Sequence, residues 1–538
     1  MARSSLRESL TSVTIAFAYA FVFRAFVIEA FVIPTGSMAP TLLGQHARVR
    51  SASTGYEWAI GPWQDSNSSV FTQVKVNDPF LGTEQEFPEL RRLSGDRILV
   101  LKYLPPLFSP ERFDVVVFKS PETPQVNFIK RLLALPGEQV ALADGDVFTR
   151  AGGGEAPSDD AWARPGWTIQ RKPDRVQQAV WQPYDDSRYA PLTSVTLRGK
   201  SSWTFSPGWE ANPVEDGKAR AILRYAGASP ASVTWKAEDA LIWDHYPYNQ
   251  VRPVMGDDAY RGRYANQSEK FPVSDLRVVL DAEIPGPGFG ASMVLTARGH
   301  EFRADLSGSR VTLRMRPEPA ASQAEPEWNI LLEADHGRRL GSSVSIEFWH
   351  VDQTLQVWID GSRAARAEYD WGPQRRIELA IGEPMADILA QNLISRGARY
   401  RAPKLAVEFS GGPLTLHRLR LDRDLHYQPG VYRYNGRGQE HSLADKPWAA
   451  THPRSTLSLS PTQFFTCGDN SPASSDARQW DTPDPWVAAT IDPSLSVVPA
   501  DLMTGKAFFV YFPSMHYEHW FSSDRAAIPD FGRMRWIW

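Results

Sequence analysis

The segment RFDVVVFKSPETPQVNFIKRLLALPGE, residues 112–138, sets the fold class. Residues 114–118 are aliphatic or aromatic after the first position, a pattern typical of a buried strand. A second apolar run covers residues 128–135 and is closed by a Pro-Gly turn signal. Upstream, residues 97–101 (RILVL) have the same character. These runs predict a mostly β fold.

Lys130 lies inside the second apolar run, where a charged side chain is unusual because its burial is costly. One interpretation is that Lys130 faces solvent while its neighbours face the core. The other is a desolvated lysine that stays neutral and accepts a proton. No acidic residue lies within residues 125–137 to oppose a fall in the pKa of Lys130.

The N-terminal segment is apolar over residues 13–23, and the pattern resumes after Arg24. A membrane-spanning helix needs about 20 mostly apolar residues, a length that is reached if Arg24 and Glu29 are tolerated at one membrane face. We therefore predict an uncleaved transmembrane anchor helix over residues 1–33.

Arg3 and Arg7 precede the apolar run, and this weak positive-inside signal predicts a cytoplasmic N-terminus. Two alternatives stay open. The segment could be a cleaved signal peptide with Ala18-Tyr19-Ala20 as its cleavage site, or a buried core helix.

The amino-acid composition excludes several classes of function. The chain has 538 residues and is 42% hydrophobic, enough for several domains with real cores. Its net charge of -4 argues against nucleic-acid binding, which requires a concentrated basic surface. Cys467 is the single cysteine, which excludes an internal disulfide framework and a cysteine-based zinc site.

The middle of the chain has a different pattern. Residues 151–160 (AGGGEAPSDD) are typical of a linker or an exposed loop. Short alternating runs separated by turn signals then predict a β-sandwich; they lie at residues 276–284, 344–348, 355–359 and 405–409. The block IEFWHVDQTLQVWIDG, residues 346–361, resembles the lectin-like or laminin-G-like jelly-roll sandwiches over about residues 270–425.

Two polar segments could carry chemistry. Ser37 lies in IPTGSMAPTL, residues 33–42, a Gly/Pro loop that suits a nucleophile but is structural more often than not. The other segment is GDNSPASSDAR, residues 468–478, in which Asp476 and Arg478 could form an ion pair.

Taken together with GDRILV (residues 95–100) and the lysine segment, these stretches resemble the sequence boxes of bacterial type I signal peptidase, also called leader peptidase. The resemblance covers residues 1–150 and about 425–538, but not the middle. Two departures are Thr35 and Ala477, where the family often has serine. The resemblance implies a split β catalytic domain, residues 34–150 and 426–538, interrupted by an inserted module of residues 151–425.

The resemblance also implies the roles of individual residues. Ser37 would be the nucleophile and Lys130 the general base of a Ser-Lys dyad, a variant of triad chemistry. Ser474 would orient the lysine, while the Thr35 hydroxyl and the Ser37 N–H would form the oxyanion hole. The residues expected to scaffold the site are Gly468, Asp469, Asn470, Asp476 and Arg478. No metal and no cofactor is expected.

The resulting hypothesis is a membrane-anchored serine endopeptidase that cleaves signal peptides from exported preproteins after a small-x-small motif. The expected partners are preproteins, the lipid bilayer and the protein secretion translocon, with no nucleic acid. The expected location is the bacterial inner membrane, with a single span and an extracytoplasmic catalytic domain.

Two other hypotheses compete with it. A self-cleaving Ser-Lys protease would use the same dyad. A membrane-tethered binding protein would act through its lectin-like sandwich and use the protease fold as a support.

Overall fold

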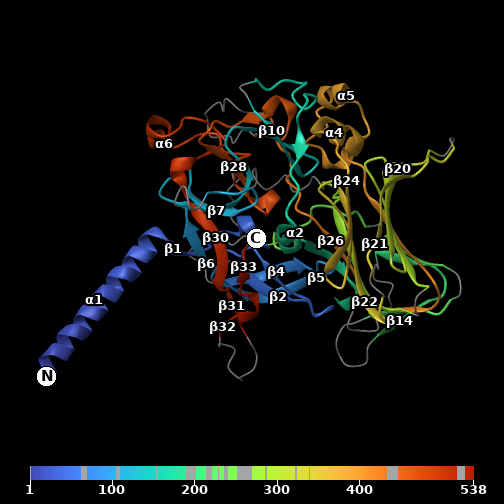
Figure 1. Ribbon diagram of the computed structural model, residues 1–538, viewed down its shortest axis with the longest axis horizontal. Coiled ribbons are helices and arrows are strands. Elements are labelled where there is room, and N and C mark those ends of the chain that lie inside the picture. The colour runs from blue at the N-terminus through green and yellow to red at the C-terminus, as the bar shows by residue number, and fades with distance from the viewer. Residues whose placement is uncertain are drawn as a thin grey trace.

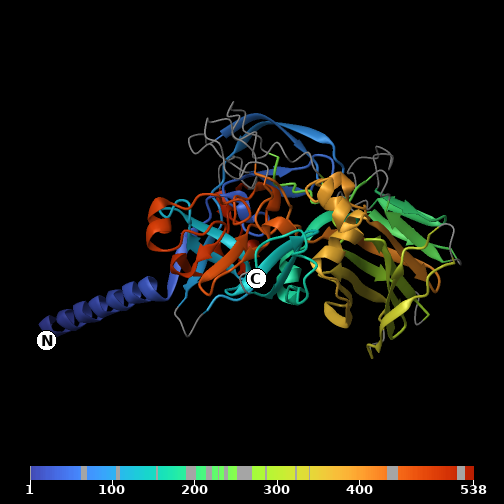
Figure 2. The same cartoon turned by 90° about the horizontal axis from the view of Figure 1, so that it is seen from above.

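The computed structural model describes residues 2–61, 70–103, 109–152, 155–189, 202–213, 221–227, 230–235, 240–250, 270–284, 288–320, 324–337, 340–432, 446–517 and 527–538. Strands make up most of its regular structure, so the prediction of a mostly β fold is confirmed. Two β-rich bodies lie side by side, and helix α1 (Ala2–Phe26) projects from the first, away from the second (Figures 1 and 2).

The first body contains an antiparallel sheet formed by both ends of the chain. Its strands are, in spatial order, β1 (Ile28–Val32), β6 (Arg97–Lys102), β30 (Met503–Phe512), β7 (Val115–Lys119), β8 (Asn127–Ala134), β28 (Gln463–Cys467) and β29 (Val498–Pro499), with β33 (Arg535–Trp536) beside β30. Because β30 lies between β6 and β7, and β28 pairs with β8, the C-terminal segment completes a sheet that the N-terminal segment begins.

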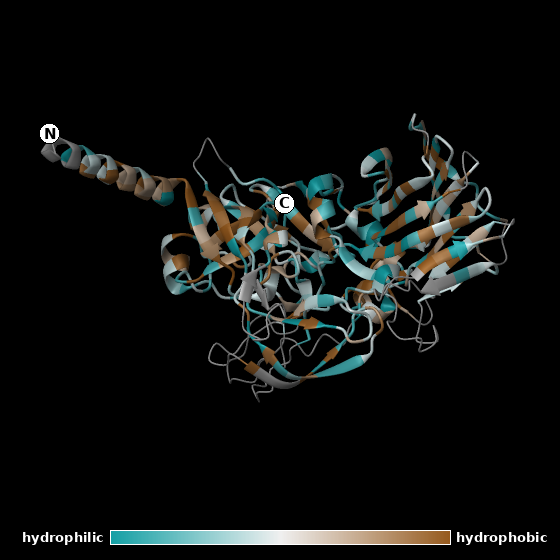
Figure 3. Cartoon of the chain, turned by 90° about the horizontal axis from the view of Figure 1, so that it is seen from below, coloured by the Kyte–Doolittle hydropathy of each residue, from teal (hydrophilic) through white to brown (hydrophobic). Residues whose placement is uncertain are grey.

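Helix α1 ends at Phe26, which corrects the predicted anchor helix of residues 1–33. The residues after it form the edge strand β1, which pairs with β6 from Ile28 opposite Leu101 to Val32 opposite Arg97. Strand pairing prevails here because it gives the backbone a partner and because Glu29 forms an ion pair with Lys102 at 2.9 Å. The stretch Arg7–Phe26 is still long and apolar enough to cross a membrane, and it has no protein packed around it (Figure 3).

Smaller elements lie around this sheet and around the second body. A second antiparallel sheet has the order β11 (Thr168–Ile169), β10 (Asp146–Ala151), β9 (Glu138–Ala143) and β27 (Leu457–Ser458). Three hairpins are β2 (Ala47–Arg50) with β3 (Glu57–Ile60), β4 (Val70–Asn77) with β5 (Glu84–Arg91), and β31 (Met515–Tyr517) with β32 (Ala527–Pro529). Short helical segments are η1 (Gly36–Met38), α2 (Asp174–Val180), η2 (Ser187–Tyr189), η4 (Gly397–Arg399), η5 (Pro453–Ser455), η6 (Ser471–Ala473), α6 (Pro485–Thr490), η7 (Ala500–Leu502) and η8 (Phe531–Arg533).

The second body is a β-sandwich. One sheet has the order β14 (Trp209–Pro213), β15 (Ala221–Tyr225), β26 (Leu414–Arg423), β17 (Leu276–Glu283), β22 (Ser343–Val351), β23 (Thr354–Ile359) and β24 (Ser362–Glu368), with β12 (Gln182–Asp186) beside β26. The other has the order β13 (Trp203–Phe205), β16 (Ala231–Trp235), β25 (Lys404–Ser410), β18 (Gly290–Ala297), β19 (His300–Ser307), β20 (Arg310–Pro317) and β21 (Asn329–Asp335). Alternate residues of both sheets, such as Val278 and Met293, are fully buried in one core between them.

The two bodies share an apolar contact. Helices α4 (Pro373–Ile381) and α5 (Met385–Ala390), which follow β24 in the chain, pack against β9 and β10 of the first body. Ile377 and Ile388 meet Phe148 and Trp162 there, and all four side chains are buried. The sandwich therefore packs against the first body and is not joined to it by the chain alone.

Candidate active site

Ser37 and Lys130, predicted from sequence as a dyad, lie in direct contact. The Lys130 Nζ donates a hydrogen bond to the Ser37 Oγ at 2.6 Å. Both residues are buried, with exposed fractions of 7% for Ser37 and 3% for Lys130. A serine hydroxyl that shares a short hydrogen bond with an amine can pass its proton to that amine if the amine is neutral.

Local structure explains why these residues meet. Ser37 lies in the η1 turn directly after β1, and Lys130 lies on β8, where it is opposite Val116 of β7. Consecutive residues of β8 from Ile129 to Ala134 are buried, so both faces of the strand are covered and the Lys130 side chain is almost fully removed from solvent. The interpretation in which Lys130 faces solvent is therefore wrong.

Burial lowers the pKa of Lys130 to about 8. The Asp476 carboxylate opposes this fall, and Asp469 also opposes it more weakly. Sequence inspection found no acid near Lys130 because it considered only neighbours along the chain. With a pKa of about 8, roughly a tenth of the lysine would be neutral at pH 7.

Ser474 is close to the dyad but does not make the expected hydrogen bond to Lys130. Its Oγ is buried and has no hydrogen-bond partner among the residues that the structure describes. A Cβ on Gly468 would lie 2.3 Å from the Ser474 Oγ and 2.4 Å from the Ser37 carbonyl oxygen. Gly468 therefore lets the Ser474 loop and the Ser37 loop approach each other, which a larger residue would prevent.

The two groups expected to form the oxyanion hole differ in their surroundings. Thr35 precedes η1 and its side chain is exposed. The Ser37 N–H has no hydrogen-bond acceptor within the described part of the chain. A free backbone donor next to the nucleophile suits stabilisation of an oxyanion.

Asp476 and Arg478 form a fully buried ion pair with two parallel hydrogen bonds, both 2.8 Å long. Burial favours the neutral acid, but Arg478 holds the pKa of Asp476 below its usual range. Asp476 also accepts a hydrogen bond from the Gly468 N–H at 2.9 Å, and Arg478 donates to the Ser471 carbonyl at 2.9 Å. The pair thus holds the loop of residues 468–476 in shape.

A second buried ion pair lies beside the dyad. Arg131, next to Lys130 on β8, donates to both carboxylate oxygens of Asp469 at 2.7 and 2.6 Å, and both side chains are fully buried. The sequence identified Asp469 as a scaffold residue but not its partner, because 338 residues separate them.

Asn470 holds the backbone of the nucleophile loop directly. Its side-chain amide donates to the Gly36 carbonyl at 3.0 Å, and its backbone N–H donates to the Ser37 carbonyl at 3.0 Å. The sequence predicted Asn470 as a scaffold residue of the site. In the structure its backbone N–H bonds the carbonyl of Ser37 itself.

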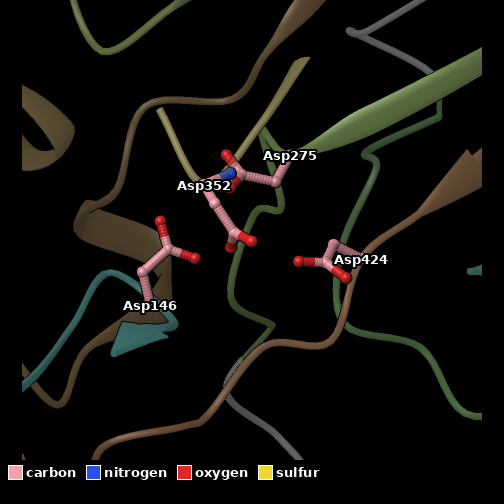
Figure 4. A group of neighbouring side chains, drawn as sticks. All are labelled: Asp146, Asp275, Asp352 and Asp424. Atoms are coloured by element: carbon pink, nitrogen blue, oxygen red, sulfur yellow. Dashed lines mark hydrogen bonds between the residues drawn. The ribbon is translucent and has the colours of Figure 1, made fainter. Parts of the chain in front are cut away.

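A group of four buried aspartates lies away from the dyad, where the two bodies meet (Figure 4). One carboxylate oxygen each of Asp146, Asp275, Asp352 and Asp424 lies within 4.8 Å of the others. Lys172 contacts Asp352 and lies 2.8 Å from Asp424, while Arg298 and Arg376 contact Asp275. Cations of the chain thus already neutralise much of this charge, and the group links the two bodies through ion pairs.

The match to a family model lies in the N-terminal part of the chain. Residues 6–161 match the family model described as signal peptidase, peptidase S26. Signal peptidase I of Rickettsia typhi (strain ATCC VR-144 / Wilmington) is 26% identical over 144 residues, which are 27% of this chain and 43% of that protein. Signal peptidase I of Rickettsia bellii (strain OSU 85-389) is 24% identical over 186 residues, which are 35% of this chain and 47% of that protein. The chain thus spans less than half the length of these curated relatives.

Among solved structures, the carbohydrate binding module CBM66 from Bacillus subtilis matches 41% of this chain and 95% of its own, with 9% identity and a TM-score of 0.22. Sheep galectin-11 in complex with glycerol matches 28% of this chain and 90% of its own, with 11% identity and a TM-score of 0.17. Likenesses this distant carry no argument about a shared ligand.

Proposed function

Because residues 6–161 match the family model described as signal peptidase, peptidase S26, we propose that the protein is a membrane-anchored serine endopeptidase that cleaves signal peptides from preproteins with a Ser-Lys dyad. The observation that carries the proposal is the buried 2.6 Å contact between the Lys130 amine and the Ser37 hydroxyl. Residues 34–150 and 426–538 form the catalytic domain in this proposal, and residues 151–425 form the inserted module.

The chemistry follows from the contact. Neutral Lys130 accepts the Ser37 proton while the Ser37 Oγ attacks the scissile carbonyl carbon. The negative charge on the former carbonyl oxygen is stabilised by the Ser37 N–H and the Thr35 hydroxyl. As the tetrahedral intermediate collapses, the lysine ammonium gives its proton to the leaving amine, and an acyl-enzyme remains. Water, deprotonated by Lys130, then attacks the acyl carbon, and the Lys130 ammonium returns the proton to the Ser37 Oγ as the ester bond breaks and the signal peptide is released.

Substrate access is supported by the position of β1. It is an edge strand of its sheet and runs directly into the Ser37 turn. An extended substrate segment could add to this edge through backbone hydrogen bonds, which favours a peptide chain over a compact ligand.

The cellular context is part of the same proposal. Helix α1 would span the bacterial inner membrane once, with the catalytic domain on the extracytoplasmic side. The substrates would be exported preproteins with small-x-small cleavage sites, delivered by the secretion translocon and met at the lipid surface.

The test is cleavage of a purified preprotein by the detergent-solubilised full chain. We expect Ser37→Ala and Lys130→Ala to abolish cleavage, because each removes one half of the proton transfer. Lys119→Ala is the matched control, since Lys119 is exposed at the end of β7, and it should cleave like the wild type. Cleavage at the wild-type rate by Lys130→Ala would contradict the dyad.

The same samples distinguish the competing hypotheses. A wild-type chain clipped at one internal site but inert on preproteins would favour the self-cleaving protease. A chain that is inert in both respects but binds a glycan would favour the binding protein.

A further inference from the structure

A segment of the sandwich sequence reaches the nucleophile loop. Residues 240–250 lie between β16 and β17 in sequence, within the predicted insertion. Ile242 is buried in the sandwich core, and its carbonyl accepts the Val273 N–H at 3.0 Å. Only a few residues later, the Tyr246 hydroxyl donates to the Asp469 carbonyl at 2.8 Å. One short stretch therefore joins the core of the sandwich to the catalytic loops.

Asn249 makes the most specific of these contacts. Its side-chain amide pairs with that of Asn470, donating to the Asn470 Oδ1 and accepting from the Asn470 Nδ2, both at 2.8 Å. The same Asn470 Nδ2 also donates to the Gly36 carbonyl. Asn249 thus fixes the orientation of the amide that holds the backbone next to Ser37, and both N–H groups of the Asn470 side chain donate hydrogen bonds.

Tyr248 closes the other side of the nucleophile loop. A Cβ on Gly36 would lie 2.4 Å from the Tyr248 ring, so the ring rests on the backbone that precedes Ser37. The Tyr248 hydroxyl donates to the Gln45 carbonyl at 3.2 Å, and its own carbonyl accepts the Gly61 N–H at 2.6 Å. The ring is buried, and both ends of the residue are bonded to the first body.

We infer that Asn249 is a positioning residue through which the inserted sandwich sets the geometry of Ser37. This inference rests on the proposed protease function. The side-chain hydrogen bonds of Asn249 in the described part of the chain go to Asn470 and not to Ser37 or Lys130. Asn249 acts by holding Asn470, which in turn holds the Gly36 and Ser37 carbonyls. The inserted module is then a working part of the catalytic site and not an appendage.

The test compares Asn249→Ala with Gln250→Ala in the detergent-solubilised full chain. Gln250 is the matched control, because its side-chain amide also makes two hydrogen bonds, but to the Asn77 backbone of β4. Two rates are measured: preprotein cleavage, as kcat and KM, and acylation of Ser37 by a small activated acyl donor that needs no extended binding site.

Because small displacements of a nucleophile reduce rates steeply, we expect Asn249→Ala to lower kcat and the acylation rate about ten- to a hundredfold. KM should stay within about twofold of the wild type, since the substrate strand edge is untouched, and Gln250→Ala should match the wild type. Wild-type rates for Asn249→Ala, or an equal loss in Gln250→Ala, would overturn the inference.

Should Asn249→Ala fail to fold, Asn249→Leu decides, because it keeps the size of the side chain and removes only the two hydrogen bonds to Asn470. A fall in acylation of about threefold or more supports the inference, and an unchanged rate overturns it. The proposed function fails separately: a wild-type chain that is not acylated at Ser37 refutes the dyad, and the inference falls with it. Acylated wild type with unaffected variants refutes only the positioning role.

Discussion

The burial of Lys130 makes the stability of the protein depend on pH in a defined direction. In the unfolded chain the pKa of this lysine is 10.5, and in the folded chain it is about 8. At 1.36 kcal/mol per pKa unit, the folded protein loses about 3 kcal/mol when it must hold the charged amine. Because the unfolded state binds more protons between these two values, the free energy of unfolding rises with pH across that window.

The perturbation that isolates this effect is Lys130→Met, which keeps the length of the side chain and removes its charge. Urea unfolding of the detergent-solubilised full chain gives the free energy of unfolding of both proteins from pH 7 to pH 10.5. We expect the methionine variant to gain about 3 kcal/mol relative to wild type at pH 7, and this difference to disappear as pH rises from 8 to 10.5. Other titrating groups cancel in the comparison.

A difference in the free energy of unfolding that is the same at every pH would reflect the packing of methionine. Only the part of the difference that changes with pH tests the burial of the charge. Lys119→Met is the control, since Lys119 is exposed and should show no pH-dependent difference from wild type. A difference between wild type and Lys130→Met that does not vary with pH would refute the burial of a lysine with a lowered pKa.

Three further predictions follow from the same site. The rate of Ser37 acylation should rise with pH through an apparent pKa of about 8, as the neutral amine becomes available, and a flat pH profile would argue against Lys130 as the base. Asp469→Ala should lower the free energy of urea unfolding by about 3–5 kcal/mol, because it leaves the Arg131 charge buried and unpaired, whereas a loss below about 1 kcal/mol would show that this charge finds another partner. Ser474→Ala should leave the free energy of unfolding unchanged or higher by about 1 kcal/mol, because its hydroxyl is buried without a described partner, and a clear loss of stability would point to a structural hydrogen bond.

The sequence predicted the strands of the catalytic sheet well, because their apolar runs are long and uninterrupted. The runs at residues 97–101, 114–118 and 128–135 correspond to β6, β7 and β8, and those at residues 276–284 and 355–359 correspond to β17 and β23. The N-terminal helix was predicted too long because hydrophobicity alone does not distinguish a membrane helix from the edge strand β1. The register with β6, which decides between them, is not visible in the local pattern.

For the site, the order of the motifs predicted that Ser37 and Lys130 act together although 93 residues separate them. The structure places the two side chains in contact. Sequence could not find the opposing charge of Asp476 on Lys130, since that effect depends on distance in space. Nor could it find Asn249, which lies outside every motif and gains its role only because the sandwich packs against the first body.

The short junction between α1 and β1 limits the distance between the end of the helix and Ser37. A single residue, Val27, separates the helix from the sheet, and Lys102 ties the two by bonding the Ala25 carbonyl at 2.8 Å and Glu29 at 2.9 Å. With so short and fixed a connection, a chain that follows Val27 by ten residues reaches at most about 35 Å from the helix end. Under the proposed function, the position of the cut in a preprotein would depend on the distance between the scissile bond and the lipid as well as on the neighbouring side chains, and lengthening this junction would move the cut.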